Sequence, residues 1–190
     1  YPKSAQLANI QCENCHGPDN NTIHPNTKVN QERISLSSAV CGTCHGEPPR
    51  HGRYQQWAES AHGNYETAIA EGTRASCTRC HSAQGFFAWL KQGKAGNDLT
   101  LALQGAAGDA TTAELAAMGI TADTVDPITC VVCHDPHAVG TTTGLTTDAE
   151  PRIRDNTALL PSGYSALEVG KGAICITCHN TRNAEMSDFI

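Results

Sequence analysis

All ten cysteines of this 190-residue chain fall into five copies of one pattern, and none is left over. In each copy two residues separate a pair of cysteines, and a histidine follows directly. The copies are Cys12-Glu-Asn-Cys15-His16, Cys41-Gly-Thr-Cys44-His45, Cys77-Thr-Arg-Cys80-His81, Cys130-Val-Val-Cys133-His134 and Cys175-Ile-Thr-Cys178-His179. Their first cysteines are 29, 36, 53 and 45 residues apart. One short module therefore recurs with connections of variable length, unlike the fixed period of a solenoid.

C-x-x-C-H is the attachment signature of c-type haem. Two thiols at this spacing can add to the two vinyl groups on one edge of a porphyrin. The histidine that follows can then give its imidazole to the iron as the proximal ligand. We predict five covalently bound haem c groups, held by all ten cysteines. The proximal ligands would be His16, His45, His81, His134 and His179.

Three other interpretations explain the pattern less well. Zinc sites built from C-x-x-C need two pairs per metal ion, and five pairs is an odd number. Disulfides would not select a histidine after every second cysteine, and a thioredoxin-like motif would occur once, near a βαβ pattern. With nine His among 190 residues, a His after all five pairs has a chance probability on the order of one in a few million.

Four histidines lie outside the motifs and are candidate distal ligands: His24, His51, His62 and His137. His24, His51 and His137 follow the proximal histidine of their own motif by eight, six and three residues. So short a segment cannot easily pass around the porphyrin edge, so we expect these histidines to bind the iron of a neighbouring haem. His62 lies at a predicted helix end, where Gly63 would act as the terminator.

Five irons and four spare histidines leave one distal position to be assigned. Met118 and Met186 are the soft donors in the sequence, and Met/His ligation raises the reduction potential of a haem. Met118 lies in an apolar helical stretch that favours core packing, and Met186 lies in a polar tail. An amine donor, a ligand from outside the chain and an open position are the remaining alternatives.

The composition predicts a fold packed around these cofactors. Apolar residues make up 39% of the chain, with only three Phe, two Trp and four Tyr, so its own side chains supply little core. Five motifs in 190 residues give one haem for every 38 residues. We therefore expect a mostly α and irregular, haem-packed structure with little or no sheet. We also expect residues 1–190 to form a single pentahaem domain, or a piece of a longer multihaem protein.

Local patterns predict helices at about 54–62, 64–71, 84–92 and 112–118 and a short helical turn at each C-x-x-C-H unit. The stretches 92–112 and 140–147 are predicted to be surface loops.

The net charge of −6 opposes a nucleic-acid partner. No segment reaches the roughly 18 apolar residues that a membrane span needs. The start of the chain carries no signal-peptide pattern, which fits a mature protein or a piece of a longer one.

Several segments resemble the multihaem cytochromes c of bacterial and archaeal respiration. They are Cys12 to His24 (C-x-x-C-H-G-P with a later His), Trp57 to His62 (W-x-x-S-x-H), Cys130 to His137 (C-x-x-C-H-D-P-H) and Cys175 to Asn180 (C-x-x-C-H-N). The resemblance implies that the extra histidines are distal ligands to neighbouring haems. The nitrite reductases among these cytochromes typically carry a C-x-x-C-K haem, and this chain has none.

These features predict an electron-transfer protein that passes single electrons along five haems with mainly bis-His ligation, either as a single carrier or as a subunit of an extracellular filament. The alternative is a reductase of a nitrogen or sulfur oxyanion, with one haem open on its distal side. Covalent attachment to an exported chain predicts a location outside the cytoplasm, periplasmic or extracellular. The expected partners are redox proteins with a positive patch, or further copies of the chain.

Overall fold

A computed structural model of the chain describes residues 10–17, 34–48, 51–93, 110–137, 151–160 and 163–180. These residues belong to two compact units, Tyr1–Gln55 and Gln56–Ile190. The single pentahaem domain expected from the sequence stays a prediction, because it depends on haem ligands that would join the modules.

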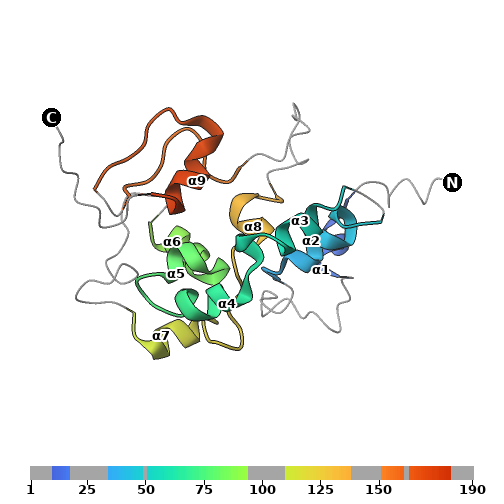
Figure 1. Cartoon of the computed structure of the whole chain (residues 1–190), viewed down its shortest axis with the longest axis horizontal. Coiled ribbons are helices and arrows are strands. Elements are labelled where there is room, and N and C mark those ends of the chain that lie inside the picture. Colours follow the sequence, from blue (N-terminus) through green and yellow to red (C-terminus); the bar gives the residue numbers. More distant parts are fainter. Residues whose placement is uncertain are drawn as a thin grey trace. The chain divides into compact units, whose positions relative to one another are not determined.

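The described residues are helical or irregular, which confirms the predicted mostly α class (Figure 1). The elements are α1 (Cys12–His16), α2 (Ser38–His45), α3 (Arg53–Ala58), η3 (Ala61–Gly63), α4 (Tyr65–Thr67), η4 (Ala68–Gly72), α5 (Thr78–His81), α6 (Ala83–Gly93), α7 (Thr112–Ala117), α8 (Cys130–Cys133), η6 (Gly170–Gly172) and α9 (Ala173–Cys178). Within the described ranges there is no β-strand, and one isolated bridge pairs His134 with Pro151. None of the described helices has the length and apolar character to cross a membrane.

Two of the four helices predicted between motifs form nearly as expected. The prediction for 84–92 is confirmed by α6, and the prediction for 112–118 is confirmed by α7. Helix α7 begins with a capping box, in which Thr111 and Glu114 satisfy each other's backbone N–H groups. Of the predicted loops, 140–147 lies outside the described residues, and so does most of 92–112.

The other two predicted helices are broken into shorter turns. Helix α3 ends at Ala58, and a separate 3-10 turn, η3, follows it. The break occurs at Ser60, whose backbone is extended and whose hydroxyl accepts a hydrogen bond from the His62 N–H. The expected 64–71 helix is a single α-turn, α4, that continues as the π-helical turn η4.

In the first unit, the second motif packs on the segment that follows it. A Cβ atom at Gly42 would lie 2.8 Å from the ring of Tyr54, so glycine permits the ring to lie against α2. The Gln55 side chain accepts a hydrogen bond from the Glu47 N–H at 3.2 Å. Helix α1, which carries the first motif, buries none of its residues. This unit therefore has little core of its own within the described residues.

The second unit has a small core centred on α5 and α6. Among the described residues, Phe86 and Trp89 of α6 are the largest fully buried side chains, and their ring centroids lie 5.4 Å apart. A Cβ atom at Gly85 would overlap the Thr78 hydroxyl and carbonyl, so glycine allows α6 to approach α5 closely. The buried hydrophobic residues are Ala68, Ala83, Phe86, Trp89, Leu115, Ile120, Val125, Val132, Ala158, Leu160, Ala173 and Ile174. Four of them are alanines, so the part of the core that the structure describes holds few large side chains.

Candidate haem-attachment sites

Each C-x-x-C-H unit lies on a helical turn, as the sequence predicts. The first two lie on α1 and α2, and the third to fifth lie on α5, α8 and α9. Where the histidine follows the end of the helix, its N–H still bonds to the carbonyl of the first cysteine, as in His134 to Cys130 at 3.0 Å and His179 to Cys175 at 2.7 Å. Residues i, i+3 and i+4 of a helical turn share one face. Each turn therefore presents two thiols and one imidazole together.

The donor set of these turns fits haem c. None of the ten cysteines forms a disulfide; four of them are exposed and the other six are partly buried. Accessible thiols at i and i+3 can form two thioether bonds to one porphyrin edge, and the imidazole at i+4 is a suitable axial nitrogen ligand. If haem is bound, the ten cysteines would attach it and the five motif histidines would be its proximal ligands, and this assignment stays a prediction.

Three motifs of the second unit lie close together. The Cys178 thiol hydrogen-bonds to the Cys80 thiol, and this contact, followed by burial, raises the pKa of Cys178. The pKa of Cys133 is raised by burial and then by Cys175, and it is lowered by Arg152. The third motif therefore adjoins the fifth, and the fourth motif lies within electrostatic range of the fifth.

A buried arginine joins the third motif to the fifth. Arg79, between the two cysteines of the third motif, is 3% exposed, and its Nη2 donates to the Thr177 carbonyl at 3.2 Å. Its guanidinium lies 4.5 Å from the centre of the Trp89 ring, in a cation–π contact. Buried guanidinium groups require such partners, so Arg79 fixes α5 against both α9 and α6.

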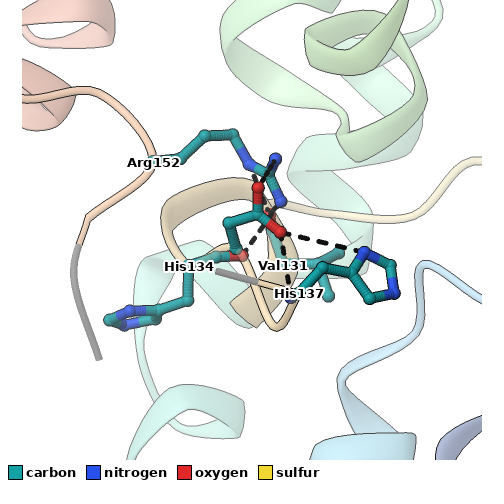
Figure 2. Close-up of polar contacts among 5 residues, drawn as sticks. Val131, His134, His137 and Arg152 are labelled. Carbon is teal, nitrogen blue, oxygen red and sulfur yellow. Dashed lines mark hydrogen bonds and ion pairs between the residues drawn. The ribbon is translucent and has the colours of Figure 1, made fainter. Parts of the chain in front are cut away.

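A second arginine holds the fourth motif. The Arg152 guanidinium donates to the Val131 carbonyl at 3.1 and 2.9 Å and to the His134 carbonyl at 3.0 Å. It also forms an ion pair with Asp135 at 3.3 Å, and its backbone N–H bonds to the Cys133 carbonyl at 2.7 Å. Figure 2 shows this guanidinium directly beside the turn that carries His134. Arg152 thus satisfies carbonyls at the end of α8 that have no intrahelical donor.

Replacing this arginine tests the arrangement. We expect Arg152→Ala to lower the free energy of unfolding by about 2–3 kcal/mol, because hydrogen bonds to a charged group contribute more than neutral ones. Denaturant unfolding followed by circular dichroism measures the change. Arg74→Ala is the matched control, since Arg74 is 63% exposed and pairs with Glu71 on the surface, which should change stability by less than about 1 kcal/mol. Equal losses in the two variants would contradict the proposed role of Arg152.

The spare histidines differ in what surrounds them. The side chain of His137 is 80% exposed, and Figure 2 shows the His134 and His137 rings pointing to opposite sides of the segment between them. His51 is exposed in the irregular stretch before α3, and His24 lies outside the described residues. His62 is exposed on η3, and its ring centroid lies 5.9 Å from that of His179, the proximal histidine of the fifth motif.

The two methionines stay unassigned as ligands. Met118 is the C-terminal cap of α7 and is partly exposed. Met186 lies outside the described residues. Among the described residues, no cluster of three or more His, Cys, Asp or Glu side chains has a metal-binding arrangement. A haem iron takes four of its ligands from the porphyrin and needs at most two from the protein.

Comparison with known proteins adds no relative to this picture. No family model, no curated protein and no solved structure matches the chain. The interpretation of the sites therefore stands on the motifs and on their geometry.

Sequence reasoning missed the contacts between motifs. Nothing in the spacing of the cysteines indicates that Cys80 meets Cys178 or that Arg79 is buried against Trp89. The available signal was weak: an arginine inside a C-x-x-C pair, two positions before the motif histidine. A charged residue at such a position reads as solvent-exposed unless the fold is known.

Proposed function

We propose that this chain is an electron-transfer cytochrome c with five covalently attached haems, mainly with two histidine ligands each. The observation that carries the proposal is that all five C-x-x-C-H units lie on helical turns and that none of their cysteines forms a disulfide. When bound, haem supplies one-electron exchange between ferric and ferrous iron. The chain attaches the groups, provides their axial imidazoles and sets the spacing between them.

The proximity of three motifs supports a relay. The contact of Cys80 with Cys178 and the electrostatic influence of Cys175 on Cys133 bring three attachment points into one region of the second unit. Porphyrins attached at adjoining points would lie close to one another. Short distances between redox centres favour the passage of single electrons, and saturated axial positions leave no place for substrate.

Exposed apolar side chains near the first motif and near the spare His62 support packing against porphyrin rings. Ile10 is 78% exposed and lies two residues before Cys12. Tyr65 and Ile69 are 47% and 42% exposed and follow His62 within seven residues. Burial of such side chains against an apolar ring face is favourable by roughly 25 cal/mol per Å². A haem core would thus supply the apolar contact that the small protein core lacks.

Location and partners follow from the same chemistry. Covalent attachment of haem to an exported chain places the protein outside the cytoplasm, in the periplasm or beyond the cell. Haem propionates would add negative charge to a chain whose net charge is already −6. A redox partner would therefore present a positive patch, or a further copy of the chain would meet it at exposed haem edges, as in a homopolymer.

Carbon monoxide and redox titration test this function against the reductase alternative. We expect the purified protein to take up five electrons per chain and to pass them to an oxidised redox protein. We also expect the reduced form to bind almost no carbon monoxide, which requires a distal ligand on the fifth iron as well as on the four that histidines would serve. Binding of about one equivalent, together with reoxidation by nitrite or tetrathionate, would contradict the carrier and support a reductase.

A further inference from the structure

His62 and His179 bring their rings together although they are 117 positions apart in the chain. The ring centroids lie 5.9 Å apart, and the ring planes are inclined at 65°. Both side chains are exposed, so the core does not press the two rings together. His179 is the proximal histidine of the fifth motif, and His62 is one of the four histidines that belong to no motif.

We propose that His62 and His179 are the two axial ligands of one iron, that of the haem attached through Cys175 and Cys178. This assignment rests on the proposed function, because it presupposes covalent haem. It goes further by naming which distal histidine serves which of the five haems.

The separation of the rings fits two imidazoles on opposite sides of one metal ion. An imidazole nitrogen binds a transition-metal ion at about 2.0–2.1 Å. If each ring centre lies roughly 1 Å behind its nitrogen, two such rings have centres about 6 Å apart. The observed 5.9 Å agrees with this value. Two imidazoles on one axis can take different rotations about it, so a 65° angle between their planes is compatible with shared ligation.

The W-x-x-S-x-H segment explains how His62 is held in place. The Trp57 indole N–H donates to the Ile128 carbonyl at 2.8 Å, which ties α3 to the segment before the fourth motif. The Ser60 hydroxyl donates to the Trp57 carbonyl at 2.7 Å and accepts from the His62 N–H at 3.2 Å. These bonds end α3 and start η3, so the tryptophan and the serine fix the turn from which His62 projects.

The fifth motif is positioned independently of that turn. Ala173, Ile174 and Thr177 of α9 are buried, and Thr177 accepts the hydrogen bond from Arg79. His179 follows directly after α9 and is held by its N–H bond to Cys175. Two separately anchored segments therefore present imidazoles to each other, which is the arrangement that a shared axial pair requires.

Carbon monoxide stoichiometry tests the pairing on the intact haem-loaded protein. In His62→Ala, we expect one haem to become high-spin in the ferric state, and the reduced protein to bind one equivalent more carbon monoxide than the unaltered protein. The covalent haem count should stay at five, since no thioether is touched. Glu59→Ala is the matched control, because Glu59 is an exposed neighbour with no role in ligation, and it should leave the stoichiometry unchanged.

A second set of variants identifies which haem loses its distal ligand in His62→Ala. In Cys175→Ala/Cys178→Ala the fifth haem is lost, so adding His62→Ala should produce no further carbon-monoxide site. In His62→Ala/His179→Ala the two substitutions should remove axial ligands from one haem only, whether or not that haem remains attached. Mass spectrometry counts the haems that remain attached, and carbon monoxide binding counts those that have lost an axial ligand.

Three results would overturn the pairing while leaving the proposed function intact. The first is five attached haems with no additional carbon monoxide binding in His62→Ala. The second is an additional equivalent of carbon monoxide that persists after the fifth haem has been removed. The third is a change of axial ligation at two haems in the double histidine variant. A protein without haem would instead refute the proposed function itself.

Discussion

Loss of the third motif is expected to remove one haem and to unfold much of the second unit. In Cys77→Ala/Cys80→Ala, we predict four haems instead of five and a loss of more than about 4 kcal/mol, the range associated with loss of a structural cofactor or a core element. The reason is the position of α5, which packs against η4, α6 and α9. The side chain of Cys80 also adjoins that of Cys178 in the fifth motif.

The first motif supplies the matched control for this experiment. Helix α1 buries no residue, so Cys12→Ala/Cys15→Ala should also remove one haem but should leave residues 56–93 protected. Intact mass counts the haems in both variants, and hydrogen exchange of peptides from 56–93 reports the stability of the second unit. Five haems in either variant would show that its cysteines do not attach a haem. Equal hydrogen exchange of residues 56–93 in both variants would show that α5 does not stabilise the second unit.

Truncation of Trp89 is the second change with a large expected effect. Trp89 is 1% exposed, and it packs on Phe86 and under the Arg79 guanidinium. We expect Trp89→Ala to cost about 3–5 kcal/mol, as for other buried aromatic residues replaced by alanine. The change also removes the cation–π partner of Arg79, which links the third motif to the fifth through Thr177. Chemical denaturation followed by far-ultraviolet circular dichroism measures the loss.

Two further variants separate this effect from a general sensitivity to aromatic loss. Trp89→Phe keeps an aromatic ring below Arg79 and should recover part of the stability. Tyr164→Ala removes a ring that is 58% exposed and should change the free energy of unfolding by no more than about 0.5 kcal/mol. A loss below about 1 kcal/mol in Trp89→Ala would mean that this side chain is not the centre of the core.

The C-x-x-C-H spacing allowed the local structure of each motif to be predicted, because residues at this spacing lie within one helical turn. All five motifs form helical turns, and α6 and α7 lie where local sequence patterns predict helices at 84–92 and 112–118. The expected 54–62 helix failed at Ser60, since a serine hydroxyl that accepts from a nearby backbone N–H competes with helix continuation. The sequence alone did not reveal this choice.

Contacts between motifs could not be predicted from spacing. These contacts join residues that lie from 18 to 117 positions apart in the chain. Arg79 binds the Thr177 carbonyl, Arg152 binds the His134 carbonyl, and the His62 ring lies beside the His179 ring. Such pairings depend on how loops of variable length close, and many closures differ little in free energy. The sequence therefore offers the candidate distal ligands as a set, whereas the proposed pairing of His62 with His179 rests on a contact that only the structure provides.

The intact mass of the purified protein, measured together with its absorption spectrum, tests the central claim most directly. The account predicts a coloured protein with a mass five haem groups above the 20.1 kDa polypeptide, retained under denaturing conditions because the thioether bonds are covalent. A colourless protein with the mass of the bare polypeptide, or of the polypeptide with zinc, would contradict it.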